Sequence, residues 1–154
     1  MITSWRIVKA KYASTAFEGE GSRRAGGRWN SRGLPIIYTA ESAALAALEL
    51  LVHLGRTRTL PEYVVFSCTF PESIVETVHP DGLPSNWRAH PAPVALRRFG
   101  DDWAGNRRSG ALKVPSAVID GENNYLLNPE HRSFRRITIS APQRFELDRR
   151  LLRQ

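Results

Sequence analysis

The stretch IIYTAESAALAALELLVHL, residues 36–54, decides most of the predicted fold. Its first four residues, Ile36 to Thr39, are β-branched or aromatic and predict a short buried strand. From Glu41 to Leu54 the residues are mostly small or aliphatic, which predicts a helix with Gly55 as its stop. The stretch therefore supplies one strand and one strong helix.

The predicted helix carries one central carboxylate, Glu49, on an otherwise apolar surface. On a helical wheel, Leu45 belongs to the main apolar arc, while Leu50 and Leu54 make the opposite side apolar as well. A helix that is apolar all round is expected to be buried, so Glu49 requires a partner or a function. A structural ion pair with an arginine and a catalytic role explain it equally well.

Several further strands and a short helix are expected outside this stretch. The expected strands are Trp5 to Val8, Tyr63 to Phe70, Leu112 to Ile119, Phe134 to Ile139 and Arg144 to Leu147. Pro115 interrupts one of them, which favours a sheet edge or a bulge there. Residues 13–33 predict a loop, and residues 94–98 predict a short helix. Many strands with one strong helix indicate a single α+β domain over residues 1–154.

The composition fits one soluble domain with a strongly positive charge. Of the 154 residues, 42% are hydrophobic, 19 are arginine, and the formal net charge is +7. The lone Cys68 excludes an internal disulfide and fits a reducing cytoplasm. The N-terminus lacks the apolar run of a signal peptide, and no stretch approaches the ~20 apolar residues of a membrane span. A cytoplasmic protein is expected.

The arginines are compatible with several partners. A guanidinium binds phosphate through two hydrogen bonds, and positive charge favours an acidic protein partner. Codon usage in a GC-rich genome and an ordinary solvated surface explain the same excess. An activity on RNA also stays open, since arginines and scattered histidines can serve phosphate binding and acid–base chemistry.

The segment Ala25-Gly26-Gly27-Arg28-Trp29-Asn30 is a candidate phosphate-binding turn. Paired glycines allow the backbone to approach a phosphate closely, and Arg28 can bind it with two hydrogen bonds. The same letters also describe an ordinary surface turn with Trp29 in the core.

Two further polar residues stand in apolar surroundings. Ser116, directly after Pro115, can point its hydroxyl into a cleft or bond to the neighbouring backbone. Asn128 precedes Pro129, which marks a turn, and is either a cap or a ligand contact. No Gly-x-Ser-x-Gly elbow, P-loop, dinucleotide fingerprint or metal-ligand spacing is present in the sequence, so none of those chemistries is indicated.

Five fragments taken in order resemble the RES domain family. They are GGRW at 26–29, IIYTAES at 36–42, ALAALELLVHL at 44–54, VPSAV at 114–118 and NYLLNP at 124–129. The family is named for an arginine, a glutamate and a serine, which correspond to Arg28, Glu49 and Ser116. The resemblance extends from Trp5 to about Ile139, and residues 79–110 match least clearly.

The resemblance implies a fold similar to ADP-ribosyltransferase toxins, with a cleft for NAD⁺ between β-rich halves. Family members act as toxins that degrade NAD⁺ by hydrolysis or phosphorolysis, and some ADP-ribosylate a protein. NAD⁺ is thus implied as a substrate, without a redox role and without a metal. The implied protein partner is an Xre-type helix-turn-helix antitoxin whose tail covers the cleft. Direct nucleic-acid binding by the chain and membrane association are not expected, and a homodimer is compatible with these features.

This chemistry suggests a role for each candidate residue. Cleaving the nicotinamide–ribose bond creates positive oxocarbenium character on the ribose, while nicotinamide leaves as a neutral group. Glu49 is expected to stabilise that charge, bind the ribose hydroxyls or orient the acceptor. Arg28 is expected to hold phosphate, Tyr38 to stack on nicotinamide, Ser116 and Asn128 to bind the ribose or carboxamide, and Arg6 to support the phosphate side.

Two alternatives remain at this point. An RNA-directed toxin predicts salt-dependent RNA affinity and little effect of removing Glu49. A protein that has kept the RES fold but lost catalysis predicts antitoxin binding without any change in cellular NAD⁺. The intact arginine, glutamate and serine weigh against the second.

Overall fold

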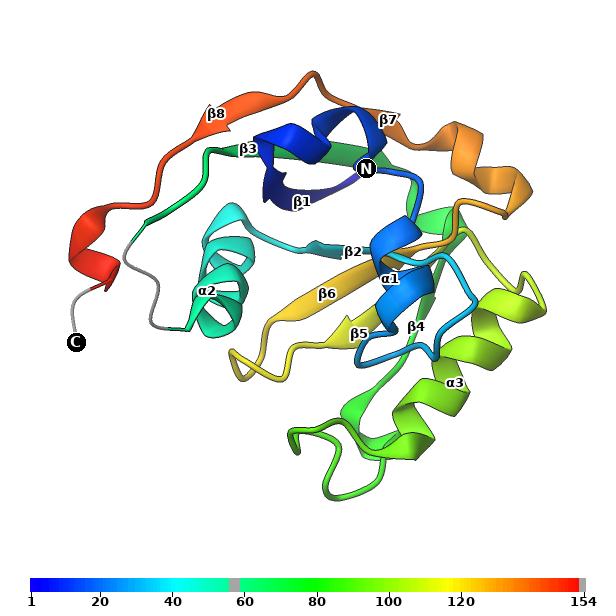
Figure 1. Ribbon diagram of the computed structural model, residues 1–154. Helices are drawn as coiled ribbons and strands as arrows, with labels where there is room; N and C mark the ends of the chain where they lie inside the picture. Colours follow the sequence, from blue (N-terminus) through cyan, green and yellow to red (C-terminus); the bar gives the residue numbers. More distant parts are fainter. Residues whose placement is uncertain (56–58, 153–154) are drawn as a thin grey trace.

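The computed structural model describes residues 1–55 and 59–152, which form one twisted sheet with helices packed on it (Figure 1). The strands are β1 (Ile2–Lys9), β2 (Ile37–Ala40), β3 (Tyr63–Phe70), β4 (Val75–Thr77), β5 (Ala111–Pro115), β6 (Asn123–Leu127), β7 (Thr138–Ile139) and β8 (Gln143–Phe145). The α-helices are α1 (Glu20–Ala25), α2 (Ala43–Leu54) and α3 (Val94–Gly105). The 3₁₀ segments are η1 (Ala10–Thr15), η2 (Glu72–Ile74), η3 (Pro80–Gly82), η4 (Arg132–Arg136) and η5 (Arg149–Leu152).

The sheet consists of two halves that meet at a single residue pair. The strand order is β4-β5-β6-β2-β1-β3-β7, and β8 also pairs with β3. Strand β1 pairs with β3 along its whole length, but it meets β2 only at Trp5 and Ala40. The half made of β4, β5, β6 and β2 therefore opens away from the half made of β1, β3, β7 and β8.

Helices α2 and α3 cover different parts of the same face of the sheet. Leu45 of α2 packs with Ala40 and with Trp5 of β1. Trp103 of α3 is fully buried and packs with Leu126 of β6. Directly paired strand residues share a face, so the register places Trp5, Ala40 and Leu126 on that common side. The strip of β2 and β6 between the two helices, here called the interhelix strip, holds the candidate site.

The opposite face carries a second apolar core. Its main members are Ile37, Cys68, Phe70, Tyr125 and Leu127, and Phe17 packs against them. This core holds the two halves of the sheet together from the side that faces away from α2 and α3.

Helix α2 lies where the sequence predicts it, with Ser42 as its N-cap and Gly55 in a positive-φ conformation at its end. The expectation that it is buried on all sides is wrong. Within the helix only Leu45 and Ala46 are buried, and Val52 is 62% exposed. The helix packs on the sheet with one face, because its solvent-facing side meets no other element of the described chain.

Other sequence predictions need correction. Strand β5 lies inside the sheet, between β4 and β6, and Pro115 is tolerated because it pairs with β6 beyond the end of β4. Residues 13–33 include helix α1, which Glu20 stabilises through ion pairs to Arg23 and Arg24. The helix expected at 94–98 continues to Gly105, and the strand expected at 134–139 is η4 followed by the short β7.

Candidate functional site

Glu49 points from α2 onto β6, where a side-chain amide holds its carboxylate. Asn124 Nδ2 donates to both oxygens of Glu49, at 2.9 and 3.0 Å, and also to the carbonyl oxygen of Thr39 at 3.2 Å. Among the described residues, no arginine or lysine forms an ion pair with Glu49. The ion pair between Glu49 and an arginine, which was one of the two alternatives from the sequence, is therefore not formed within the described residues.

Burial raises the pKa of Glu49 above its ordinary value, because desolvation disfavours the charged form. The hydrogen bonds from Asn124 and Ser116 act in the opposite direction, and the nearby carboxylate of Glu122 raises the pKa further. A desolvated carboxylate that is held in place interacts strongly with any positive charge that develops beside it.

Ser116 lies beside Glu49 at the start of the turn between β5 and β6. Its hydroxyl is 3.4 Å from Glu49 Oε1 and accepts hydrogen bonds from the backbone N–H groups of Val118 and Ile119, at 3.1 and 3.2 Å. The residue is 1% exposed. The hydroxyl thus organises its own turn, which is one of the two interpretations from the sequence, and it also faces the carboxylate of Glu49.

Arg28 lies at the other side of the interhelix strip, in the glycine-rich turn. Its Nη1 donates to the carbonyl oxygens of Trp87 and Ala89, at 3.1 and 3.0 Å. The side chain is half-buried, and within the described part of the chain its Nε and Nη2 have no hydrogen-bond partner. Burial lowers the pKa of Arg28. One edge of the guanidinium is thus fixed, and the other edge is available for an anion.

The segment from Trp87 to Ala89 connects Arg28 to the Ser116 turn. The carbonyl oxygens of Trp87 and Ala89 accept hydrogen bonds from Arg28. Arg88 lies between these two residues, and its Nη2 donates to the carbonyl oxygen of Ala117 at 3.3 Å. Ala117 follows Ser116 directly. Residues 79–110, which match the family least clearly in the sequence, therefore join the arginine side of the site to the glutamate side.

Tyr38 projects from β2 toward the same face and is fixed by the glycine-rich turn. Its hydroxyl donates to Asn30 Oδ1 at 2.5 Å and accepts from the Trp29 N–H at 3.1 Å. A Cβ atom on Gly27 would lie 2.6 Å from this hydroxyl, so the turn needs glycine there to let the ring approach. Trp29 itself is buried, as expected from the sequence. Burial raises the pKa of Tyr38, so its hydroxyl stays protonated.

Two of the candidate residues lie elsewhere. Arg6 alternates with Trp5 along β1 and so projects from the opposite face, where it donates to the carbonyl oxygens of Ala16 and Tyr38 at 2.8 and 2.9 Å. Burial lowers the pKa of Arg6 to about 10. These bonds bridge β1 to β2 where the two strands separate, which is a structural role.

Asn128 lies at the far end of β6, under α3. Its Nδ2 donates to the carbonyl oxygen of Ala104 at 3.1 Å, and its Oδ1 accepts from the N–H of Glu130 at 3.0 Å. The residue is 1% exposed. Its amide thus ties α3 to the turn after β6, which fits the cap that the sequence offered as one alternative.

Sequence reasoning missed Asn124, the residue with the closest contacts to Glu49. Asn124 stands in the NYLLNP fragment, four positions before Asn128 and opposite Ala40 in the register of β2 and β6. The fragment marks this region of the chain as part of the site, but only the strand register shows which of its two asparagines faces α2.

Metal-binding clusters and membrane-spanning helices are both absent from the described residues. Within residues 1–55 and 59–152, no three histidine, cysteine, aspartate or glutamate side chains lie close enough to hold a metal ion. In the same residues, no helix has the length and apolar character needed to cross a bilayer.

Comparisons with known proteins agree on one family. The RES domain model matches residues 3–148. The chain is 40% identical over 148 residues to a protein named Toxin Res from Yersinia enterocolitica, covering 96% of this chain and 97% of that protein. It is 34% identical over 160 residues to a protein named Prs ADP-ribosylating toxin from Sphingobium sp., covering 100% and 99% of the two chains.

A solved structure confirms the predicted fold. The crystal structure of the M. tuberculosis MbcT–MbcA toxin–antitoxin complex contains a chain that matches with a TM-score of 0.77 and 20% identity, over 94% of this chain and 84% of that one. At this identity the likeness concerns the fold alone. Together with the family match over nearly the whole length and the two relatives, it leads to one conclusion: this chain belongs to the RES domain family.

Proposed function

We propose that the chain is the toxin of a toxin–antitoxin pair and that it cleaves the nicotinamide–ribose bond of NAD⁺. The observation that carries the chemical part is the desolvated carboxylate of Glu49, which Asn124 holds beside Ser116 on the interhelix strip. The relatives named as toxins support the biological part.

In this mechanism the chain holds NAD⁺ at its nicotinamide and at its pyrophosphate and stabilises the charge on the ribose between them. The free edge of Arg28 binds the pyrophosphate, and the ring of Tyr38 contacts nicotinamide. As the bond to neutral nicotinamide breaks, positive charge grows on the ribose, and the Glu49 carboxylate stabilises it. Water, phosphate or a protein side chain then takes the ADP-ribose.

The partner in this proposal is an Xre-type antitoxin that covers the site. The solved structure with the similar fold is described as a toxin–antitoxin complex. The excess of 22 lysines and arginines over 15 acidic residues favours association with an acidic surface.

Transfer of ADP-ribose to a protein is a second candidate function. A relative that matches this chain along its full length is named Prs ADP-ribosylating toxin. The same carboxylate and arginine serve both reactions, since both begin with loss of nicotinamide and differ only in the acceptor.

The proposal is tested by incubating the purified chain, freed of any antitoxin, with NAD⁺ and measuring free nicotinamide. Parallel reactions without phosphate, with phosphate and with cell extract identify the acceptor through free ADP-ribose, ADP-ribose 1-phosphate or labelled protein. Folded protein that releases no nicotinamide under all three conditions contradicts the proposal.

Asn124→Ala is expected to lower kcat for nicotinamide release by about a hundredfold, because misplacing a catalytic group reduces the rate on that scale. The KM for NAD⁺ should change little. Asn124→Asp is expected to shift the acid limb of the kcat–pH profile upward, since a second carboxylate raises the pKa of Glu49. The control is Asn123→Ala, whose side chain contacts Glu41 at 3.4 Å and not Glu49. Equal losses in the Asn123 and Asn124 variants would contradict a positioning role.

The raised pKa of Glu49 predicts opposite pH effects on activity and stability. Activity should fall as the pH drops through this pKa, so the acid limb should lie above the ordinary glutamate value of 4.5. The folded chain binds this proton more tightly than the unfolded chain does. Glu49 therefore stabilises the fold most at low pH, and that contribution is lost as the pH rises through the raised pKa. In thermal melts, the Tm of Glu49→Gln relative to that of the wild type should therefore increase as the pH rises. A Tm difference that stays constant with pH would contradict this.

A further inference from the structure

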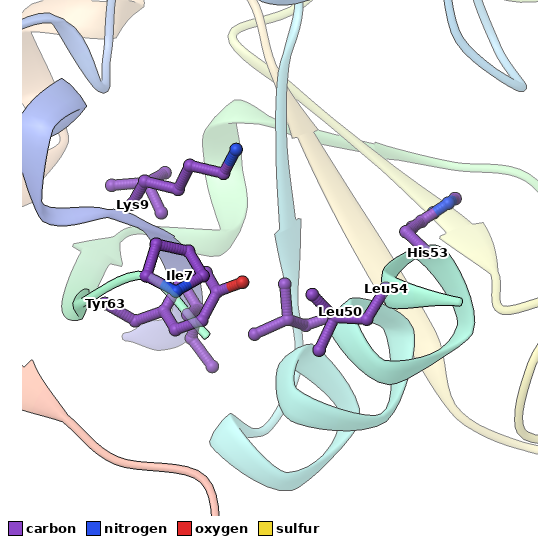
Figure 2. Close-up of a pocket in the computed structure, with 8 residues that line it drawn as sticks. Ile7, Lys9, Leu50, His53, Leu54 and Tyr63 are labelled. Carbon is purple, nitrogen blue, oxygen red and sulfur yellow. The ribbon is translucent and has the colours of Figure 1, made fainter. Parts of the chain in front are cut away.

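A separate hollow lies on another side of α2, away from Glu49. It has a volume of about 370 Å³ and is formed by the end of β1, the last turns of α2 and the start of β3 (Figure 2). Leu50 and Leu54, which line it, occupy a different side of the helix from Glu49. Neither Arg28, Glu49 nor Ser116 lines this hollow. It is therefore distinct from the candidate NAD⁺ site.

The hollow contains an unpartnered buried hydroxyl. Tyr63 is 4% exposed, and its hydroxyl is the one buried side-chain polar atom without a hydrogen-bond partner in the described part of the chain. Figure 2 shows this hydroxyl pointing toward Leu50 on the facing helix. Folded proteins satisfy nearly all buried polar groups, because an unsatisfied one costs stability. A donor kept in such a state is suited to a ligand that brings an acceptor.

A positively charged side chain, Lys9, lines the same hollow as this hydroxyl. Lys9 and Tyr63 are direct partners in the register of β1 and β3, so their side chains share one face of the sheet. His53 lines the hollow from the facing helix, and no acidic side chain is among the lining residues. In the described residues no carboxylate forms an ion pair with Lys9. The donors at this end of the hollow therefore favour an anionic acceptor.

The remaining walls are apolar. Ile7, Leu50, Leu54 and Pro61 contribute hydrocarbon surface to the hollow. An occupant with an apolar body gains from removing this surface from water.

We propose that this hollow binds a small carboxylate with an apolar body. The apolar part lies between Ile7 and the two leucines of α2, and the carboxylate accepts hydrogen bonds from the Tyr63 hydroxyl and the Lys9 ammonium group. This inference is independent of the NAD⁺ chemistry, because its residues and its test do not involve Glu49.

The affinity test uses 4-ethylbenzoate as the probe and the neutral 4-ethylbenzamide as its matched control. Titration of the ¹⁵N-labelled full chain should shift the backbone amides of Ile7, Leu50 and His53 with the benzoate. The benzamide should bind at least tenfold more weakly. Tyr63→Phe should weaken benzoate binding about tenfold, as expected for loss of a hydrogen bond to a charged group. Equal affinity of the two probes, or of wild type and Tyr63→Phe, would overturn the proposal, as would absent shifts at these amides.

Lys9→Met keeps the aliphatic stem but removes the charge, and it should weaken benzoate binding several-fold. Lys11→Met is the matched control, because the Lys11 ammonium group lies over the ring of Tyr12 and does not line the hollow. An equal effect of the two lysine variants would show that the probe responds only to the overall charge, which would overturn the assignment of Lys9.

A melting experiment tests the hydroxyl without any ligand. Tyr63→Phe removes an unsatisfied polar atom and should raise the Tm by about 3 °C. Saturating 4-ethylbenzoate should then raise the Tm of the wild type more than that of the variant. A lower Tm for unliganded Tyr63→Phe would show that the hydroxyl has a partner in the folded chain, and it would overturn the proposal.

Discussion

Glu49→Gln is expected to lower the rate of nicotinamide release from NAD⁺ by about a thousandfold, the scale of losing one preorganised charge-stabilising group. The substitution keeps the shape of the side chain and removes only the charge that faces the ribose. The Glu49 carboxylate is desolvated and held by Asn124, so water cannot easily replace its effect. Nicotinamide release by the purified variant and by the wild type, at equal protein concentration, measures the difference.

Glu122→Gln is the matched control for this variant. Glu122 is close enough to raise the pKa of Glu49, but the hydrogen bonds that hold Glu49 come from Asn124 and Ser116. Its removal should leave the turnover at neutral pH near the wild-type value and shift the acid limb slightly downward. Undiminished turnover in a folded Glu49→Gln protein would remove Glu49 from the mechanism. Loss of folding in that variant would instead assign Glu49 a structural role.

Gly100→Ala is expected to lower the free energy of unfolding by about 3 kcal/mol, at the upper end of the cost of overpacking. Helix α3 crosses the glycine-rich turn at this residue, and an added Cβ would overlap the carbonyl oxygen of Trp29 and lie 2.8 Å from its carbonyl carbon. Backbone cannot yield as a flexible side chain does, so the helix and the turn must separate. Arg28 precedes Trp29, so NAD⁺ cleavage should fall as well. Urea denaturation and the nicotinamide assay measure the two effects.

Gly105→Ala in the same helix separates this contact from a general effect of replacing glycine. An added Cβ at Gly105 meets no atom within 4 Å. This change should therefore be neutral or stabilise the chain by up to about 1 kcal/mol, because alanine restricts the unfolded chain more than glycine does. If Gly100→Ala is as stable as Gly105→Ala, the close packing of α3 on the turn is contradicted.

The sequence predicts α2 and β3 well because their patterns are local. Tyr63 to Phe70 alternates and is rich in β-branched and aromatic residues, and the structure has the same bounds. Helix α2 ends at the glycine stop that the sequence marks, while its N-cap is Ser42, so the helix begins two residues after the predicted start at Glu41. Its degree of burial was not readable, since the apolar side that carries Val52 is not covered by any element of the described chain.

The end of α3 was missed because tertiary packing overrides its local signals. Its second half contains two glycines and two aspartates, which weaken a helical pattern. The helix continues because Gly100 allows close contact with the turn and Trp103 is completely buried against the sheet. Glycine is favourable at position 100 because the glycine-rich turn lies directly against the helix, and the sequence does not show where that turn lies.

The candidate site was predictable to the extent that the family fragments mark it. The structure places the Ser116 hydroxyl 3.4 Å from Glu49, and Arg28 donates to the carbonyl oxygens of Trp87 and Ala89, the neighbours of Arg88, which donates to Ala117. Asn124 and Asn128 were not distinguishable in sequence, since both lie on one extended segment, Asn124 within β6 and Asn128 directly after it, about 13 Å apart at the rise of extended chain. The register places the first under α2 and the second under α3.

The most direct measurement for the central claim is a crystal structure of the Glu49→Gln chain with NAD⁺, because this variant should bind the dinucleotide without cleaving it. We expect the nicotinamide ribose next to Gln at position 49 and the pyrophosphate on the free edge of Arg28, with one molecule spanning the interhelix strip. NAD⁺ bound on the opposite face of the sheet, or density that reaches only one of these two side chains, would contradict it.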